Sequence, residues 1–467
     1  MTLTPTLTMP PDPVDELLER MRPVAAQAVD ALQVAASLEV DGITDHIAQV
    51  QYGYADVFAL AKEVRLRAGS AGSTATPATG MPRGWALALP DVTHGLLYLL
   101  PAAVFPAALA VLGRRSLVLG LVVASGLGWV WAGGATWMAY RLLGRGHPGS
   151  AARVLRWSAL AGLPVAAAAS VAVVATTGAG YGLTAMAVAQ MAYQMSSALL
   201  MFYRREAWLF AAMAPAVMAG FAFLAGGARL LPLAIAVGAG SVAVAFGVAL
   251  GQTNDRQKRR EPRLRDGLRG ELGQLPLVLL YTALSATFLL QAHGRYMLGS
   301  LDIPIASIPL IVGMGVVEWR ARRFGEQARA LLSRVRYPRE FVGRVWLLLT
   351  RDVGVCVGVV ALVAVALLAA LRAAHLLSSA GVVMTAASVV LAGAYLVGFL
   401  LANMARYAWL CGSLAGCIAV HVALVAAAPR ELSPLADTTV FLGSALLLFL
   451  LFLAALAGRL GQARYHR

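Results

Sequence analysis

Amide and hydroxyl side chains stand inside apolar stretches at two places in the chain. Gln190 and Gln194 are four residues apart, and so are Tyr281 and Ser285. Residues at this spacing share one face of an α-helix. An amide both donates and accepts hydrogen bonds, which suits sugar hydroxyls and suits bonds between neighbouring helices equally well. These four residues are candidates for binding a polar substrate, and interhelical hydrogen bonding is the alternative interpretation.

Four charged residues are further candidates. Glu318 precedes a group of arginines, and it either forms an interfacial ion pair with them or acts as a gate or proton site. Asp91 precedes an apolar stretch, where a helix cap explains it. Arg115 and Arg295 are candidates for contacting an anionic headgroup or pyrophosphate, because guanidinium groups bind phosphate oxygens in pairs. Almost no acids are expected at mid-membrane depth, so we expect weak or absent proton or sodium coupling through buried carboxylates.

Apolar stretches of membrane-spanning length must position these residues. Hydrophobic residues make up 59% of the chain and charged residues 13%, with a mean hydropathy of +0.72. Because a bilayer core needs about 20 apolar residues per helix, the pattern from Asp91 onward predicts an all-α protein with about twelve transmembrane helices. Most of the 38 Lys and Arg residues lie in every second break or at the C-terminus. This asymmetry predicts a multi-pass protein of the cytoplasmic (inner) membrane with both termini in the cytoplasm.

Matching loop lengths and charges predict that the spans form two like-oriented lobes of six helices. A tight turn is expected after each fourth span, at Arg204 and at Arg406. The amphipathic stretch 326–345 is expected to lie on the inner membrane surface. We expect five parts: a small helical cytoplasmic module (1–67), a flexible linker (68–84), an N-lobe (85–251), a basic cytoplasmic inter-lobe loop (252–273) and a C-lobe (274–467). The module is too small for a large core, so we expect it to lean on the membrane domain or on a protein partner.

Several classes of protein are disfavoured. The net charge of +15 comes from basic residues that lie between apolar spans and form no separate basic domain. Membrane lipid rather than nucleic acid is therefore the expected partner. Cys356, Cys411 and Cys417 lie in or beside apolar spans and predict neither a disulfide framework nor a metal site. A membrane-embedded transferase needs acids or an acid–histidine pair at a catalytic depth, and no such motif is evident, so we expect no enzyme activity and no cofactor. Residues 141–156 contain no acid, which disfavours a major-facilitator transporter.

Three stretches carry a family resemblance. They are AYRLLGRGHPGSAARVLRWSALAGLP (139–164), ALLMFYRREAWLFAAMAPAV (198–217) and GVVEWRARRFGEQARALLSRVRYPREFVGRV (315–345). These stretches resemble segments of the multidrug/oligosaccharidyl-lipid/polysaccharide exporter superfamily, and the third is most similar to transporters of the Pel-polysaccharide type. The soluble N-terminal module departs from the usual pattern of that superfamily.

The resemblance implies two lobes in a V around a central cavity that opens alternately to each side. It implies a flippase or exporter that moves lipid-linked oligosaccharide or polysaccharide. Some members of the superfamily use an acid in the first span for cation coupling, and Asp91 would be its counterpart here. Two alternatives stay open: a MATE-like efflux transporter for drugs or amphiphiles, and a non-transporting membrane subunit of a polysaccharide synthesis or secretion complex, with residues 1–67 as its docking piece.

Overall fold

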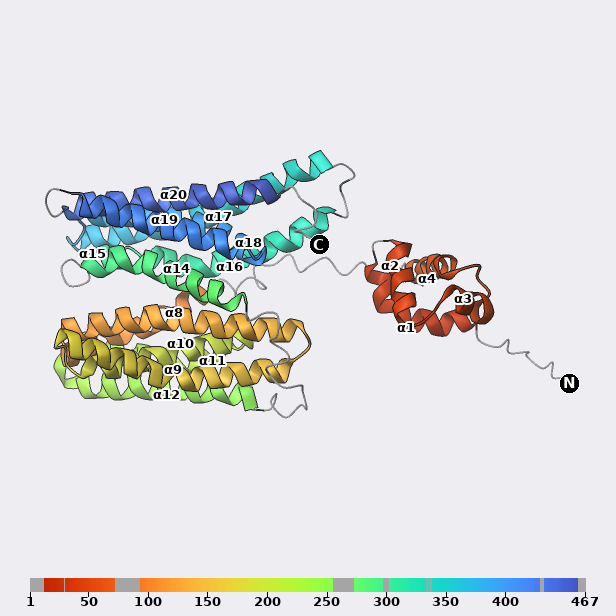
Figure 1. The fold of residues 1–467 in the computed structure, drawn as a ribbon. Helices are drawn as coiled ribbons and strands as arrows, with labels where there is room; N and C mark the ends of the chain where they lie inside the picture. The colour runs from red at the N-terminus through yellow and green to blue at the C-terminus, as the bar shows by residue number, and fades with distance from the viewer. Residues whose placement is uncertain are drawn as a thin grey trace, which may run out of the picture. The chain divides into compact units, whose positions relative to one another are not determined.

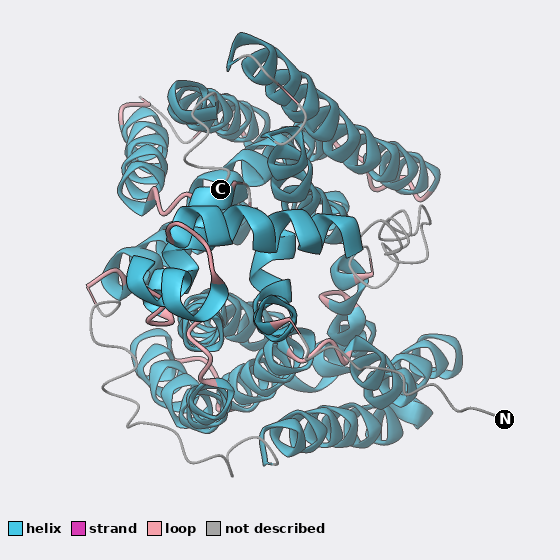
Figure 2. Cartoon of the chain, turned by 90° about the vertical axis from the view of Figure 1, so that its right-hand side faces the viewer, coloured by secondary structure: helices cyan, strands magenta, loops and turns pink. Residues whose placement is uncertain are grey.

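The chain divides into two compact units, Met1–Trp85 and Ala86–Arg467. The computed structural model describes residues 12–28, 30–71, 93–254, 273–296, 302–332, 335, 338–428 and 432–460. All regular structure in these ranges is helical, as Figure 2 shows. The all-α expectation is therefore confirmed. Asp91, most of the expected linker and most of the expected inter-lobe loop fall outside the described residues.

The N-terminal unit contains four helices around its own apolar core. They are α1 (Pro13–Gln27), α2 (Ala31–Val40), α3 (Asp45–Tyr52) and α4 (Val57–Ala71). Asp12 accepts a hydrogen bond from the Val14 backbone N–H at 3.0 Å, as expected of a residue before a helix that begins with proline. Arg67 donates to Asp12, and this bond holds the pKa of the Asp12 carboxyl below its ordinary value.

The first half of the membrane unit forms the N-lobe. Its elements are α6 (His94–Leu97), η1 (Leu100–Val104), α7 (Phe105–Leu112), α8 (Arg114–Gly144), α9 (Pro148–Thr177), α10 (Gly182–Phe202), α11 (Glu206–Gly226), η2 (Gly227–Leu230) and α12 (Leu231–Asn254). The first span is broken into three short pieces, and prolines begin two of them. Proline lacks a backbone N–H and cannot continue the hydrogen bonds of a preceding helix, which accounts for the breaks.

The second half forms the C-lobe. Its elements are α14 (Leu275–Tyr296), α15 (Asp302–Ile305), α16 (Ile308–Leu332), α17 (Pro338–Ala373), α18 (Ser379–Asn403), α19 (Tyr407–Ala426) and α20 (Pro434–Leu460). Figure 1 shows the two lobes as separate bundles, with α8 and α14 along their boundary. The stretch 326–345 is divided between the ends of α16 and α17, and its expected place on the inner membrane surface stays a prediction. Its apolar residues pack the two ends of an antiparallel hairpin against each other.

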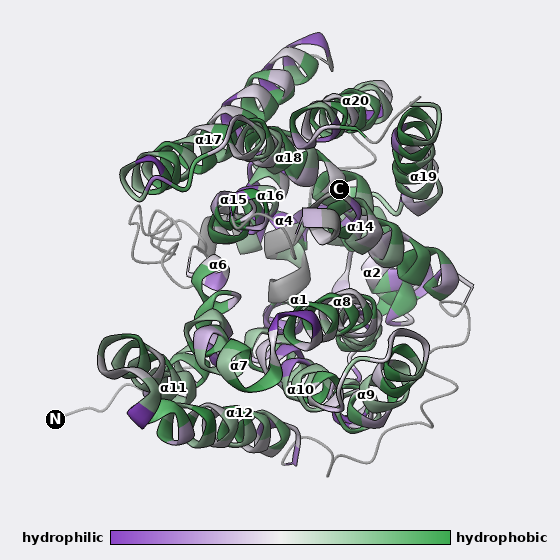
Figure 3. Ribbon diagram, turned by 90° about the vertical axis from the view of Figure 1, so that its left-hand side faces the viewer, coloured by the Kyte–Doolittle hydropathy of each residue, from purple (hydrophilic) through white to green (hydrophobic). Residues whose placement is uncertain are grey.

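Each of the twelve expected spans has a helical counterpart in the described part of the chain. Nine helical segments there are long and apolar enough to cross a membrane, and one of them, Glu206–Asn254, contains both α11 and α12. These two helices pack against each other as a hairpin. The helices α10 and α14 supply the remaining two spans within the same bundles. Apolar residues cover the outward faces of peripheral helices such as α12 and α19 (Figure 3), as expected of a multi-pass membrane protein.

The two lobes repeat the same packing arrangement. In the N-lobe, α10 packs against α8, α9 and α12, while α11 packs against α12 and the first span. In the C-lobe, α18 packs against α16, α17 and α20, while α19 packs against α20 and α14. Each contact in one lobe thus has a counterpart six spans later. This correspondence agrees with the expected pair of six-helix lobes.

The turn after each fourth span also repeats. Arg204 and Ala405 both adopt a left-handed backbone, with φ of 56° and 55°. In both turns the backbone N–H of the next residue donates to the carbonyl oxygen five residues earlier. These bonds run from Arg205 to Leu200 at 2.8 Å and from Arg406 to Leu401 at 3.0 Å. Both helices therefore end in the same C-terminal motif, at the two places where tight turns were expected.

The junctions α8–α9, α10–α11, α16–α17 and α18–α19 lie at one end of the membrane unit, on the right in Figure 1. We call this the basic end, because arginines gather there. The arginines of these junctions include Arg141, Arg145, Arg204, Arg205 and Arg406.

Candidate gating site between the lobes

A buried histidine joins the two lobes near the basic end. His94 begins α6 in the N-lobe, and its Nδ1 lies 3.1 Å from Oε2 of Glu318 on α16 in the C-lobe. Its Nε2 lies 3.1 Å from Oε1 of Glu206, the first residue of α11. The side chains of His94 and Glu206 are buried, and that of Glu318 is 26% exposed. One imidazole thus bridges two carboxylates, and one of its two bonds crosses between the lobes.

This arrangement depends on a proton. Ionised carboxylates only accept hydrogen bonds, whereas a neutral imidazole donates from one ring nitrogen and accepts at the other. Both bonds therefore need one additional proton, carried either by His94 or by one of the two carboxyl groups. Without that proton, a ring lone pair faces a carboxylate at 3.1 Å. Because Glu318 is partly exposed, the proton can exchange with solvent from that side.

The backbone around His94 is held from both lobes. Gly95 lies so close to α16 that an added Cβ would overlap the carbonyl oxygen of Val312. In the N-lobe, the Tyr193 hydroxyl donates to the carbonyl oxygen of Leu97, at the end of α6. That carbonyl loses its helical partner because α6 ends there, and the tyrosine satisfies it. The short α6 is thus fixed against α10 while it contacts α16.

A second pair of helices joins the lobes. Three glycines of α8 face apolar atoms of side chains on α14: Gly126 faces Leu290, Gly133 faces Thr282 and Gly134 faces Leu279. Small residues let two helices approach closely in a membrane, and they leave few interlocking side chains to resist separation. The repeat relates these two contacts to each other. Within their lobes, α6 corresponds to α14 and α8 corresponds to α16, so the contact of α6 with α16 is equivalent to the contact of α14 with α8.

Further polar groups surround the bridging histidine. The Tyr98 hydroxyl lies within electrostatic range of Glu318. The Tyr140 hydroxyl lies within range of both carboxylates and also of Arg204 and Arg322. No cluster of His, Cys, Asp or Glu among the described residues is arranged to hold a metal ion. The two contacts of His94 suit the site to hydrogen bonding and proton transfer. We call His94, Glu206 and Glu318 the latch.

The predicted amides lie on α10, inside the N-lobe. Gln194 faces α8, where its side-chain oxygen occupies the space beside Gly128, and this oxygen is buried without a hydrogen-bond partner. Gln190 is half-buried one turn away. A substrate-binding role for these two residues stays a prediction.

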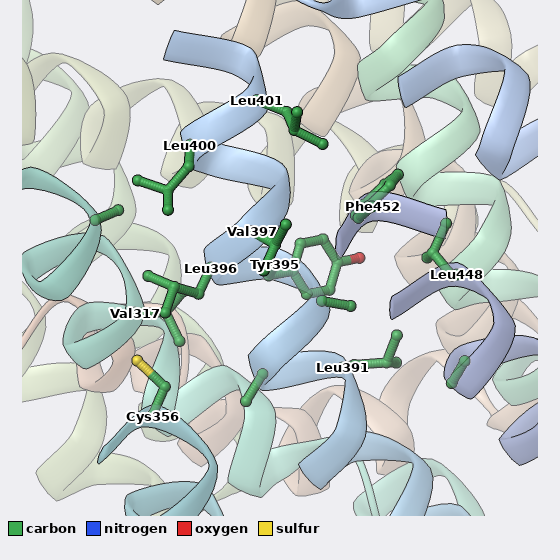
Figure 4. Packing of buried hydrophobic residues seen from close by; sticks show 14 of the residues in the cluster. Val317, Cys356, Leu391, Tyr395, Leu396, Val397, Leu400, Leu401, Leu448 and Phe452 are labelled. Carbon is green, nitrogen blue, oxygen red and sulfur yellow. The ribbon is translucent and has the colours of Figure 1, made fainter. Parts of the chain in front are cut away.

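Tyr281 and Ser285 lie on the side of α14 that faces the interior of the C-lobe. They line a narrow crevice with Tyr395, whose ring projects toward Leu448 and Phe452 of α20 (Figure 4). The rings of Tyr281 and Tyr407 are 6.0 Å apart. The Ser285 hydroxyl is buried without a hydrogen-bond partner. Their predicted role in binding substrate is untested, and the structure places them away from the glycine face of α8.

The remaining predicted residues are spread along the chain. Arg115 donates to the carbonyl oxygen of Thr177 at 2.9 Å, which links the start of α8 to the end of α9. Asp91 and the side chain of Arg295 lie outside the described residues. Glu318 was predicted as a gate or ion pair, and the structure brings it to His94, 224 residues away in the sequence.

Other buried acids also pair with residues distant in sequence. Asp437, in the first turn of α20, lies 3.4 Å from His421 and accepts a bond from the Tyr296 hydroxyl at 2.8 Å. Asp302 accepts from the backbone N–H of Ser378, at the start of α18. Asp352, also buried, pairs with Arg320. Asp302 and Asp437 lie in the first turns of their helices, so these pairs leave the expectation of almost no acids at mid-membrane depth untested.

No family model matches the chain, and no curated protein matches it. Among solved structures, the chain is similar to one titled "Crystal structure of MATE in complex with MaD3S". The identity is 13% and the TM-score 0.47, over 81% of this chain and 94% of that chain. A likeness at this level bears on neither substrate nor mechanism.

Proposed function

We propose that this protein is a membrane transporter that alternates access by moving its two lobes relative to each other. The observation that carries the proposal is the latch, in which His94 of one lobe bonds Glu318 of the other. The lobes repeat one packing pattern, and a glycine-lined face of α8 supplies a second contact between them. Rigid lobes joined through two helix pairs, α6 with α16 and α8 with α14, can rock as units, which is the motion that alternating access needs.

The latch gives this motion a chemical control. When the shared proton is present, both hydrogen bonds of His94 form and the lobes are held together at the basic end. Loss of the proton replaces one bond by repulsion and favours separation. Transport is then coupled to proton exchange at the latch. We place the basic end at the cytoplasmic face of the inner membrane, because arginines favour that side.

The substrate that we propose is a lipid-linked oligosaccharide or polysaccharide. Such a molecule carries phosphate, and the basic end supplies guanidinium groups, including Arg204 and Arg322 within electrostatic range of Tyr140. Efflux of a cationic amphiphile is the second candidate. Glu206 and Glu318 favour it, because separation of the lobes would expose two carboxylates to a cation.

Reconstituted proteoliposomes separate these candidates. We expect the protein to flip a fluorescent short-chain polyprenyl diphosphate sugar, and His94→Asn to reduce the rate roughly tenfold or more, since the inter-lobe bond is charge-assisted. His375→Asn is the matched control, because His375 is exposed and adopts the left-handed backbone that asparagine tolerates.

The outcomes are distinct. Movement of an organic cation but not of the lipid-linked sugar would favour efflux. Movement of neither substrate, with lipid-linked sugar bound only when a synthesis partner is added, would favour a non-transporting subunit and contradict the proposal. Equal rates for the wild type and His94→Asn would leave a transporter but remove the latch from its mechanism.

A further inference from the structure

A groove lies between the ends of α16 and α17 at the basic end. It has a volume of about 350 Å³. Its walls are almost entirely apolar, and two arginines stand among the residues that form it. The lining residues are Gln327, Ala330, Leu331, Arg344, Leu347, Leu348 and Arg351. None of them belongs to the latch.

The arginines and leucines form one stripe on α17. Arg344, Leu347, Leu348 and Arg351 follow the spacing of residues that share a helix face. Leu347 is 70% exposed, although leucine is an apolar residue. Val365, eighteen residues or five turns further along, is exposed on the same face. The groove is therefore continuous with the lipid-facing surface of α17.

Charges on α17 fix the depth of the groove. The helix carries no charged residue over 353–371, between Asp352 and Arg372. That stretch measures about 28 Å, close to the thickness of a bilayer hydrocarbon core. Arg351 thus stands at the level of the lipid headgroups. Arg344 lies about 10 Å further along the helix, on the aqueous side.

The existing partners of the two arginines leave donors for another ligand. Arg344 pairs with Glu340 at 2.6 Å in a surface pair of the kind that contributes little. Arg351 donates to Gln327 at 2.8 Å and lies 3.4 Å from Asp352, which Arg320 already neutralises. A guanidinium group carries five N–H donors, and these contacts use only some of them.

We propose that this groove binds an anionic phospholipid from the leaflet at the basic end. The phosphate lies against Arg344 and Arg351, the glycerol-ester part of the lipid covers Leu347 and its apolar neighbours, and the acyl chains continue along the apolar face of α17 toward Val365. The apolar walls favour a lipid over free phosphate, and the arginines favour an anionic headgroup over a zwitterionic one. This site is independent of the transported substrate, because the latch contributes nothing to it.

The test titrates the purified, delipidated full chain with phosphatidylglycerol and with phosphatidylcholine, and it counts bound lipid by native mass spectrometry. We expect tighter binding of phosphatidylglycerol. Arg344→Gln with Arg351→Gln should weaken that binding by roughly fivefold for each arginine removed. Ala330→Trp keeps every charge but fills the groove, so it should weaken binding of both lipids. Arg339→Gln is the matched control, because Arg339 is an exposed arginine of the same helix outside the groove.

Some results would overturn the proposal. Equal affinity for the two lipids would remove the role of the arginines, and unchanged binding in Ala330→Trp would remove the groove. Inorganic phosphate that competes as well as phosphatidylglycerol would show a phosphate site with no need for a lipid. Each variant is compared with the wild type by its elution volume in size-exclusion chromatography, so that loss of folding is separated from loss of binding.

Discussion

Substitution of Glu318 by glutamine should weaken the latch without removing it. The side-chain oxygen of glutamine still accepts from His94, but the bond loses its charge. Hydrogen bonds to charged groups contribute about 1.5–3 kcal/mol and neutral ones about 0.5–1.5 kcal/mol. Because Glu318 is 26% exposed, we take the lower end of this difference. The expected loss of about 1 kcal/mol changes the ratio of joined to separated lobes roughly fivefold.

Spin labels can measure this ratio. Leu143 on α8 and Arg329 on α16 are exposed near the basic end, one on each lobe, and both are suitable for replacement by labelled cysteine. The native cysteines are all buried, so they compete little for the label. Double electron–electron resonance should show a larger long-distance population in Glu318→Gln than in the labelled wild type. Glu340→Gln, which removes an exposed surface acid, should leave the distances unchanged.

The long-distance population should depend on pH in a defined direction. In the wild type, the joined state needs the shared proton, so the long-distance population should grow as pH rises. In Glu318→Gln, a neutral imidazole can still donate to the amide oxygen, so this growth should be much weaker. A wild type whose distances do not change with pH, or a Glu340→Gln variant that matches Glu318→Gln, would refute the reasoning.

Three further predictions concern packing and stability. Gly95→Ala should separate the lobes in the same spin-label measurement, because its new Cβ meets a backbone carbonyl. Gly240→Ala is the control, because the surroundings of Gly240 on α12 are open, and its effect on stability should be neutral or slightly favourable. Arg320→Met should lower the free energy of unfolding by about 3 kcal/mol, because it removes the main partner of the buried Asp352 carboxylate. Unfolding in mixed detergent micelles measures this loss, and the added substitution Asp352→Asn should recover part of it. The depressed pKa of Asp12 contributes stability that is present above the ordinary carboxyl pKa and is lost as pH falls through the folded value, so Asp12→Asn should reduce the acid sensitivity of the N-terminal unit in circular dichroism melts.

Hydropathy and loop charge were sufficient to predict the scaffold. A span of apolar residues must be helical in a bilayer, because no water is present to satisfy its backbone. The tight turns at Arg204 and Arg406 were visible because a short basic break between two apolar runs leaves room only for a turn. The breaks in the first span were less visible, although Pro101 and Pro106 stand at two of them.

The latch could not be predicted from local sequence. His94 and Glu318 are 224 residues apart, and their contact depends on how the lobes pack. His421 is a second example, because no acid lies at helical spacing in its own apolar stretch. Its partner, Asp437, lies at the start of the next helix, where an antiparallel hairpin brings the two together. Pairing each solitary histidine with acids at the ends of neighbouring spans would have found it.

The repeat itself shows where the lobes have diverged. Glu206 and Tyr407 each stand two residues after the left-handed turn that ends the fourth helix of their lobe. In the N-lobe this position bonds a histidine of the first span, and in the C-lobe it packs against Tyr281 of the equivalent helix. A purely structural position would be satisfied by aromatic packing in both lobes, as it is in one. Burying an acid and a histidine costs more free energy than burying two aromatic rings. The extra free energy of burial in the N-lobe is explained if the site must exchange a proton. The corresponding pair of tyrosines in the C-lobe has no such role to fulfil.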